Sequence, residues 1–487
     1  MGEISGRSER DGPLTPPHVR DIPRLLISAA HKSSGKTTLS VGLCAAVRAR
    51  GLSVQPFKKG PDYIDPLWLT LAAGRSCHNL DFYLTGRNEL LSTFARYSSG
   101  ADVCLIEGNK GLYDGLDLDG SNSNAALATL YDAPVILVLD ARGMTRGVAP
   151  LILGYRQFAP EVRIAGVILN QLGGSRHEAK LRAVIEHYTD VPVLGAVHRD
   201  EQLTLVERHL GLIPSNEAKN ASARINALAD AVSAAIDIER LLGIARSAPA
   251  LAVPDEPDQA AYSSANIRIG IARDAAFAFY YPGDLDGLTN AGASLVSIDT
   301  LRDPRLPPVD ALFIGGGFPE THMKALEANV SLRRSIRGAI ESGLPVYAEC
   351  GGLMYLARTI SWNGHRAEMV GALPLDVTMH DRPVGRGYVQ LRETGLGLWP
   401  GEHKNTPPLE IRAHEFHYSS VDNLSKNTRF AYEVLRGYGI DGRHDGIVYK
   451  NVLASYSHLR DVATHRWTTR FVRFATEHRA LQTSINH

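Results

Sequence analysis

Short apolar runs alternate with helix-forming stretches from residue 24 onward, and this alternation constrains the fold more than any other feature of the chain. In the first half such runs include RLLISA (24–29), DVCLIEG (102–108), APVILVLD (133–140) and RIAGVILN (163–170). Continuous apolar runs of this length are typical of strands buried on both faces. The pattern therefore predicts an α/β protein with a mostly parallel sheet and helices on both faces.

A second α/β pattern starts at IRIGIARD (267–274) and continues through ALFIGGGFPE (311–320) and LPVYAECGGLMYLA (344–357). Between the two patterns lies a stretch rich in Pro, Ala and small polar or acidic residues, without periodicity, which is typical of a linker. The N-terminus is polar and has no apolar core of a signal peptide. We expect a disordered tail at 1–20, one domain at 21–245, a linker at 246–265 and a second domain at 266–487.

The charge balance favours a small-molecule partner. Lys+Arg and Asp+Glu both count 52 in 487 residues, and no basic cluster with interleaved aromatic residues appears, so we expect no nucleic-acid partner. No apolar run approaches the roughly 20 residues that cross a bilayer, so we expect no membrane association and a cytoplasmic protein. The four cysteines form no CxxC pair, which argues against a zinc site and against a disulfide framework.

The segment Ser34-Gly35-Lys36-Thr37-Thr38 lies between the strand RLLISA and a helix, which is the setting of a P-loop. Backbone N–H groups would bind phosphate oxygens, Lys36 would neutralise the β and γ charge, and the Thr37 hydroxyl would ligate Mg²⁺. The first glycine of GxxxxGK[ST] is replaced by Ala30. An ordinary strand-to-helix turn is the alternative, which the context makes less favourable.

Two further loops carry carboxylates at the ends of predicted strands, where an open α/β sheet binds ligands. QPFKKGPDYIDPLW (55–68) contains Lys58, Asp62 and Asp65, and a solvated turn with paired charges is its alternative. In DVCLIEGNKGLYDG (102–115), Glu107 ends the strand and Asp114 follows in the glycine-rich loop. An acid there can hold Mg²⁺, although either carboxylate could instead cap a helix or bind loop amides.

Cys350 follows the strand LPVYAE and precedes the helix start GGLMYLA, the arrangement of a nucleophile elbow. N–H groups at the helix start, including that of Gly351, would favour the thiolate and stabilise an oxyanion. Gly316 and Gly317, in the triple glycine after ALFI, would bring further backbone donors close. The other three cysteines have no such setting, and Cys44 and Cys104 are expected in the core.

The thiol needs a base, and three histidines compete for this role. His458 lies at the end of a late predicted strand in NVLASYSHLRD, whereas His414 and His417 lie in RAHEFHYS (412–419). A single histidine among the 18 in the chain is more often structural or exposed. Periodicity does not choose between the three.

Taken together, SSGKTT, PFKKGPDYIDP, NLD (79–81), EGNKGLYDG, GGGFPE, AECGGLMYL and HEFHYS resemble the cobyrinic acid a,c-diamide synthase family in their order and spacing. The resemblance spans about residues 24 to 465. It implies a P-loop domain similar to dethiobiotin synthetase, followed by a class I glutamine amidotransferase domain. It also implies a ligase that uses ATP, Mg²⁺ and glutamine on a tetrapyrrole carboxylate, and allows a homodimer.

The resemblance further implies that Cys350 attacks the glutamine amide and that His458, rather than His414 or His417, is its base. It implies catalytic roles for Asp62, Asp65, Glu107 and Asp114 around Mg²⁺, ATP and the substrate, with Thr37, Asp62 and Glu107 as metal candidates. Nucleotide-binding candidates are the P-loop residues and Lys58. Class I glutaminases usually carry a glutamate two residues after the histidine, where this chain has Arg460. The third orienting group is therefore unassigned.

Three functions stay open at this point. The first is conversion of cobyrinate to its a,c-diamide, through an acyl phosphate and ammonia from glutamine. The second is the same amidation of sirohaem or nickel-sirohydrochlorin, since KKGPDYIDPLW also resembles a subgroup associated with sulfur metabolism. The third is a P-loop partitioning-type ATPase switch with a degenerate glutaminase-like domain, against which the intact Cys350 elbow argues.

Overall fold

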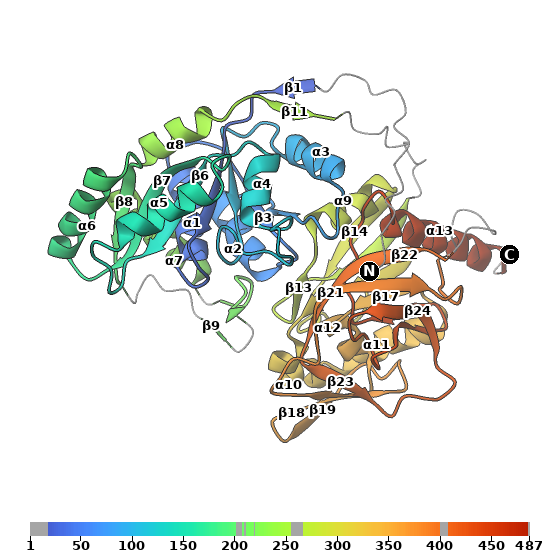
Figure 1. Ribbon diagram of the computed structural model, residues 1–487. Coiled ribbons are helices and arrows are strands. Elements are labelled where there is room, and N and C mark those ends of the chain that lie inside the picture. The colour runs from blue at the N-terminus through green and yellow to red at the C-terminus, as the bar shows by residue number, and fades with distance from the viewer. Residues whose placement is uncertain are drawn as a thin grey trace, which may run out of the picture. The chain divides into compact units, whose positions relative to one another are not determined.

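The computed structural model describes residues 18–200, 207–208, 211–218, 220–254, 266–399 and 408–485 (Figure 1). The chain divides into two compact units, each built from three stretches. Unit 1 comprises residues 1–57, 86–202 and 227–259, and unit 2 comprises residues 58–85, 203–226 and 260–487. The division therefore crosses the N-terminal half of the sequence more than once.

Unit 1 contains five strands of a seven-stranded sheet, in the order β5-β2-β6-β7-β8. They are β2 (Arg24–Ala29), β5 (Val103–Glu107), β6 (Val135–Asp140), β7 (Ile164–Leu172) and β8 (Val193–His198). All four pairings are parallel. Every residue of β2 and β5 is buried, as expected for central strands covered on both faces.

Helices connect these parallel strands and pack on the sheet (Figure 1). They are α1 (Lys36–Ala49), α3 (Arg87–Tyr97), α4 (Asn124–Leu130), α5 (Val148–Phe158), α6 (Ser175–Tyr188) and α8 (Ile238–Arg246). Parallel neighbours need such crossovers, because the chain leaves one strand at the opposite end of the sheet from where the next strand begins. The alternation of apolar runs and helical stretches correctly predicted this α/β architecture.

The expected tail and linker differ from the structure at their inner ends. Strand β1 (His18–Arg20) pairs antiparallel with β11 (Leu251–Val253). Residues 18–20 and 251–253 are therefore strand rather than tail and linker, because each three-residue segment supplies the backbone partners that the other needs. The rest of the expected tail, residues 1–17, and residues 255–265 of the expected linker lie outside the described residues.

Unit 2 is built around a nine-stranded sheet with the order β14-β12-β15-β17-β26-β25-β24-β21-β22. Its parallel part consists of β12 (Ile267–Ala272), β14 (Ala293–Ile298), β15 (Ala311–Ile314), β17 (Val346–Glu349) and β26 (Val452–Ser455). The antiparallel part consists of β21 (Gly385–Glu393), β22 (Glu410–His417), β24 (Arg429–Arg436) and β25 (His444–Tyr449).

Side chains that alternate along these strands build two separate cores. In β17, Val346 and Ala348 belong to one core, whereas Tyr347 belongs to the other. Leu312 and Phe313 of β15 divide in the same way. This is the period of two of a pleated strand, and it shows that both faces of the sheet are covered. Cys350 follows β17 directly, so its backbone is anchored between two packed layers.

Helices and smaller sheets complete unit 2. The helices include α2 (Ile64–Ala73), α9 (Pro282–Asn290), α10 (Met323–Ala328), α11 (Val330–Glu341), α12 (Gly351–Leu356) and α13 (Trp467–Ile485). A four-stranded sheet has the order β19 (His365–Glu368), β18 (Thr359–Trp362), β20 (Asp376–Met379) and β23 (Ser419–Asp422). Strand β13 (Phe277–Phe279) pairs with β16 (Gly316–Gly317). No helix in the described part of the chain is both long and apolar enough to cross a bilayer.

Candidate active sites

The P-loop joins β2 to α1 through a backbone that only a small residue permits. Gly35 has φ 88°, and a Cβ there would lie 2.2 Å from the side-chain nitrogen of Asn170. Asn170, in β7, donates a hydrogen bond from Nδ2 to the carbonyl of Ser34 at 2.9 Å. Strand β7 therefore fixes the loop from the side, and glycine is required for this close approach.

The first turn of α1 brings two of the expected phosphate and metal residues toward the end of β5. The Thr37 hydroxyl donates a hydrogen bond to Oε1 of Glu107 at 2.7 Å. Lys36 donates from Nζ to the carbonyl of Lys110 at 2.6 Å, in the loop after β5. Thr38 is half-buried behind them. The structure thus brings Lys36, Thr37 and Glu107 together in unit 1.

The oxygens at this junction fit a magnesium ion in their chemistry. A hydroxyl and a carboxylate oxygen within hydrogen-bond distance are hard donors of the kind that Mg²⁺ takes alongside nucleotide phosphates. Within the described residues, no three His, Cys, Asp or Glu side chains gather as a metal-binding cluster. Two protein oxygens suit an ion that takes its remaining ligands from nucleotide phosphates and water.

Asp114 binds its own loop. Its Oδ2 accepts a hydrogen bond from the backbone N–H of Gly111 at 2.9 Å. A Cβ at Gly111 would lie 2.7 Å from the carbonyl of Ala30, so this loop runs close against the P-loop. One oxygen of Asp114 thus has the loop-amide role that the sequence offered as the alternative to catalysis.

In unit 2, Lys58 and Asp62 before α2 lie close to Asp65 in the first turn of this helix. Lys58 Nζ lies 2.5 Å from Oδ2 of Asp65 and 3.9 Å from Oδ2 of Asp62. The other oxygen of Asp62 accepts from the backbone N–H groups of Ile64 and Asp65, at 2.9 and 3.2 Å. Asp62 therefore caps the start of α2, a role that the sequence analysis did not assign to it.

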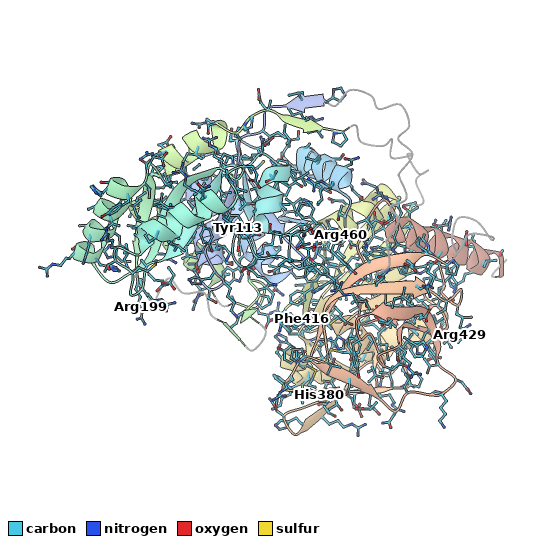
Figure 2. All side chains as sticks on the ribbon, viewed as in Figure 1. Tyr113, Arg199, His380, Phe416, Arg429 and Arg460 are labelled. Atoms are coloured by element: carbon cyan, nitrogen blue, oxygen red, sulfur yellow. The ribbon has the colours of Figure 1, made fainter. Side chains whose placement is uncertain are left out.

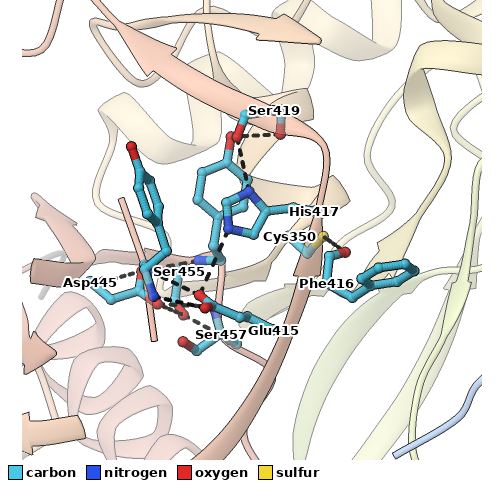
Figure 3. A network of polar contacts seen from close by, with 12 residues as sticks. Cys350, Glu415, Phe416, His417, Ser419, Asp445, Ser455 and Ser457 are labelled. Carbon is cyan, nitrogen blue, oxygen red and sulfur yellow. Dashed lines mark hydrogen bonds and ion pairs between the residues drawn. The ribbon is translucent and has the colours of Figure 1, made fainter. Parts of the chain in front are cut away.

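Cys350 adopts the strained geometry of a nucleophile elbow. Its φ is 49° and its ψ −102°, a region that side chains with a Cβ rarely occupy. Its N–H donates to the carbonyl of Ser455 in β26 at 2.7 Å, which anchors the turn to the neighbouring strand. Its thiol lies 3.9 Å from the carbonyl oxygen of Phe416 (Figure 3). The sequence correctly predicted the strand, sharp turn and helix around this residue.

The glycines around the elbow are needed because neighbouring backbone comes very close. A Cβ at Gly317 would lie 1.9 Å from the carbonyl of Ala276. At Gly316 it would lie 2.7 Å from Cε1 of His458, and at Gly351 3.0 Å from the backbone nitrogen of Gly317. The expected oxyanion glycines are thus gathered around Cys350 and His458, although part of their role is to permit this packing.

His458 lies beside the thiol and is buried, with an exposed side-chain fraction of 4%. Burial alone disfavours a charged imidazole, but the neighbouring Cys350 and Glu349 outweigh burial and raise the pKa of His458 to about 10. The imidazolium is therefore the favoured form of this ring, which can donate a proton to a leaving group.

The two competing histidines have different surroundings. His417 stacks on Tyr456 with a centroid distance of 3.8 Å, and its Nδ1 lies 2.9 Å from the carbonyl of Ser419 (Figure 3). Its Nε2 lies 3.8 Å from Glu415. His414 pairs with His458 through the backbone, and their ring centroids lie 6.3 Å apart. Burial, followed by repulsion from His458, lowers the pKa of His414 to about 3. Of the three histidines, His458 alone combines proximity to the thiol with a carboxylate partner at Nδ1.

That partner is Glu349, which the sequence analysis missed. Its Oε2 lies 3.3 Å from Nδ1 of His458. Arg460, labelled in Figure 2, stands at the position where an acid is usual. Its guanidinium lies 4.5 Å from the ring centroid of Tyr281, and its Nε lies 4.0 Å from Oδ1 of Asp284. The only sequence signal for Glu349 was its position directly before Cys350, which by itself does not distinguish it from a strand-end carboxylate.

An aromatic cluster within unit 2 was also missed. Tyr63, from the turn before α2, stacks on Phe279 with a centroid distance of 5.4 Å and an angle of 9°. Its ring lies 4.5 Å from that of Tyr281 and 5.1 Å from that of His458. Nothing in the sequence connects residue 63 with residues 279, 281 and 458, because this contact joins distant stretches of the chain.

Comparisons with known proteins agree with this division of chemistry. Residues 26–213 match the CobQ/CobB/MinD/ParA nucleotide binding domain, and residues 268–462 match the CobB/CobQ-like glutamine amidotransferase domain. A cobyrinate a,c-diamide synthase of Magnetococcus marinus is 47% identical over 461 residues, which cover 94% of this chain and 98% of that protein. The chain belongs to the cobyrinate a,c-diamide synthase family.

Other members of the family are similar over nearly the same length. The cobyrinate a,c-diamide synthase of Methanosarcina acetivorans is 43% identical, over 94% of this chain and 96% of that protein. The one of Archaeoglobus fulgidus is 41% identical, over 93% and 98%. The family resemblance inferred from the sequence is confirmed, as is a P-loop domain followed by a glutamine amidotransferase domain. A glutamine amidotransferase ligase with a nucleotide-binding domain is the class of enzyme that these findings support.

Proposed function

We propose that this protein is an ATP-dependent, glutamine-hydrolysing ligase that amidates the a and c acetate carboxylates of cobyrinate to give cobyrinate a,c-diamide. The proposal rests on the family of full-length relatives and on one observation above all, the strained backbone of Cys350 at a strand–helix junction beside His458. Such strain is kept where a reactive side chain must be presented. Relatives named for other acceptors would be expected if sirohaem or nickel-sirohydrochlorin were the substrate, so those alternatives are not favoured.

The proposed glutaminase reaction uses Cys350 as the nucleophile and the imidazolium of His458 as the proton donor. The Cys350 sulfur attacks the side-chain carbonyl carbon of glutamine, and N–H groups around Gly316, Gly317 and Gly351 stabilise the oxyanion. His458 gives its proton to the departing nitrogen, which leaves as ammonia, and then takes a proton from water. Water attacks the thioester, so glutamine and water become glutamate and ammonia with the thiol restored.

The synthetase reaction supplies an activated acceptor. A carboxylate is a poor electrophile, so transfer of the γ-phosphoryl group from ATP to the acetate oxygen would give an acyl phosphate and release ADP. Ammonia would then attack the acyl carbon, form the amide and release phosphate. Lys36 would neutralise phosphate charge, together with the N–H groups of Ser34, Gly35 and Thr38. Thr37 and Glu107 would hold Mg²⁺, which when bound offsets the charge of the phosphate oxygens.

Further parts of the proposal concern the acceptor and the setting. Lys58, Asp62, Asp65 and Asp114 would orient the nucleotide and the acceptor, with Asp62 also available to the metal. Residues 21–245 would act as the synthetase and 266–487 as the glutaminase. We place the enzyme in the cytoplasm, where thiols such as that of Cys350 are kept reduced. We also propose a homodimer, and no nucleic-acid partner.

Replacing one residue in each reaction separates the two activities. Cys350→Ala should abolish amide formation from glutamine and keep amide formation from added ammonia. Lys36→Ala should abolish amide formation from either nitrogen source and keep a folded protein. Loss of both activities in Cys350→Ala would contradict the proposed division of labour. A P-loop switch protein would release no glutamate at all, which separates that alternative by the same assay.

Cys44→Ala is a matched control. Cys44 is fully buried in α1, and burial raises the pKa of its thiol, so it is not a thiolate. The variant should keep both activities.

Mass spectrometry after incubation with ATP, Mg²⁺, glutamine and each of cobyrinate, sirohaem and nickel-sirohydrochlorin then identifies the acceptor. We expect cobyrinate to gain two amides, and a gain confined to another tetrapyrrole would contradict the proposed substrate.

A further inference from the structure

The glutaminase site holds a carboxylate, Glu349, beside His458. The position two residues after this histidine, where an acid is usual, is occupied by Arg460. We propose that Glu349 is a positioning residue, which orients the imidazole of His458 for glutamine hydrolysis in place of an acid two residues after the histidine. The inference rests on the proposed glutaminase function and concerns its geometry. It assigns the orienting role to the residue directly before the nucleophile.

Strand pairing explains how a residue so far away in sequence reaches His458. Strand β17 runs parallel to β26, and Glu349 lies opposite Ser455 in the register. The chain leaves β26 there and reaches His458 three residues later, where the backbone of His458 pairs with that of His414. The end of β17 and the histidine therefore meet at the same edge of the sheet, which places a strand-end carboxylate beside the ring.

The carboxylate of Glu349 is held in place by its other contacts. Its Oε1 accepts a hydrogen bond from the Tyr347 hydroxyl at 2.5 Å and another from the N–H of Leu459 at 2.9 Å. These contacts leave Oε2 to accept from Nδ1 of His458 at 3.3 Å. Both side chains are 4% exposed, so water competes little for this contact. With its proton held at Nδ1, the ring presents Nε2 to the thiol.

Other acids nearby are engaged elsewhere. Asp284 accepts a hydrogen bond from the N–H of Asp461 at 2.9 Å and lies 4.0 Å from Arg460. Glu415 accepts from the N–H groups of Tyr438 and Gly439, at 2.7 and 2.8 Å, and stands beside His417. Within the described residues, it is Glu349 and neither of these two acids that contacts the His458 ring.

The groups that face His458 come from several elements of unit 2. They are Cys350 at the start of α12, Glu349 at the end of β17, His414 in β22 and Tyr63 before α2. Glu349 is the only carboxylate in this described set. It is therefore the acid positioned to hold Nδ1 of the ring.

Glu349→Gln in the full chain tests the inference, because it keeps the size of the side chain and removes the charge. We expect the kcat for glutamate release to fall by about 100-fold or more, as for loss of the orienting acid in a triad. The KM for glutamine should change little, because Glu349 touches His458 rather than the substrate. Amide formation from added ammonia should remain, which shows that the protein is folded.

The pH profile separates positioning from a merely structural role. Protonation of the leaving nitrogen needs the imidazolium, whose loss sets the high-pH limb of kcat/KM. Removal of the neighbouring carboxylate favours the neutral ring, so this limb should move to lower pH by about one unit in Glu349→Gln. A fall in activity without a shift of the limb would overturn the inference.

Glu415→Gln is a matched control, since Glu415 is also a buried carboxylate beside a histidine in the same unit. It should keep the wild-type kcat and high-pH limb. If Glu349→Gln fails to fold, Tyr347→Phe decides, because it removes only one hydrogen bond to the carboxylate. A several-fold lower kcat with a shifted limb supports the inference, and wild-type kinetics overturn it.

Failure of the inference is distinguishable from failure of the proposed function. If the wild-type protein releases glutamate from glutamine and Glu349→Gln does so equally well, only the role of Glu349 is wrong. If the wild-type protein releases none, the proposed function itself is wrong.

Discussion

The side chains of Thr37 and Cys350 occupy positions where the local backbone decides what they can do. Thr37 lies two residues after Gly35, which has φ 88°, and Cys350 itself has φ 49°. Both lie where a strand ends and a helix begins, so backbone N–H groups point toward the loop. In both halves of the chain the reactive residue is therefore set by the same strand–turn–helix arrangement.

Thr37→Val should separate metal binding from folding. Valine keeps the shape of threonine and removes the hydroxyl that contacts Glu107 at 2.7 Å. We expect amide formation to fall by at least about tenfold, with Mg²⁺-dependent nucleotide binding weakened and glutamate release retained. Isothermal titration with ATP, with and without Mg²⁺, measures the effect. Unchanged Mg²⁺ dependence would remove Thr37 from the metal site.

Ser40→Ala provides the control on the same helix. Ser40 is fully buried, and its hydroxyl has no hydrogen-bond partner in the described part of the chain. Its removal should leave nucleotide binding unchanged and keep or slightly raise the melting temperature, because an unsatisfied buried hydroxyl is costly.

The sequence predicted those site residues that lie in short local motifs, and it did not reveal a residue whose role depends on contacts with distant parts of the chain. Lys36, Thr37 and Cys350 lie in local motifs, so the sequence predicted their settings. The choice of His458 over His414 and His417 came from family resemblance, and the structure adds surroundings that favour it. Glu349 could not be found, because its contact with His458 depends on the pairing of β17 with β26.

At the level of single elements, α12 is positioned by a very close approach to β15. A Cβ at Gly352 would lie 2.1 Å from the backbone carbonyl of Ile314, so the helix cannot keep its place if this residue is enlarged. Because α12 begins at Gly351, any displacement moves the Cys350 elbow as well.

Gly352→Ala should therefore destabilise the protein by about 1–3 kcal/mol and lower glutamate release, while ammonia-dependent amidation is better retained. Gly338→Ala is the matched control. It lies on the exposed side of α11 with no atom within 4 Å of the added Cβ, and should stabilise by about 0.5–1 kcal/mol. Thermal unfolding measures both, and equal melting temperatures would contradict the steric argument.

The elements themselves were predictable from apolar runs, and their boundaries nearly so. The pairing of β1 with β11 was not, because each strand has only three residues and no alternation to reveal it. The cap that Asp62 provides for α2 was also missed, since the same aspartate in a charged turn fits a catalytic reading equally well.

For the molecule as a whole, buried neutral histidines make stability depend on pH. Burial lowers the pKa of His414 and of His465 to about 3, with smaller contributions from His458 and Arg470. In the unfolded chain both would titrate near about 6.5. Because the unfolded state then binds more protons, stability should fall as the pH drops from about 6.5 toward 3.

His465→Leu should reduce this acid sensitivity. Neither ring nitrogen of His465 has a hydrogen-bond partner among the described residues, so an apolar side chain fits its surroundings. We expect a smaller fall in melting temperature between pH 7.5 and 5 than in the wild type, measured by calorimetry. The exposed His365→Gln should behave as the wild type. An equal fall in His465→Leu would contradict the argument.

The interleaving of the two units has a consequence for recombination between relatives. A crossover in the linker would exchange residues 58–85 along with the N-terminal half, although this stretch belongs to unit 2. Tyr63 would then meet foreign partners in place of Phe279 and Tyr281. The two halves of this chain therefore cannot be exchanged independently between relatives. A functional chimaera must keep residue 63 compatible with residues 279 and 281.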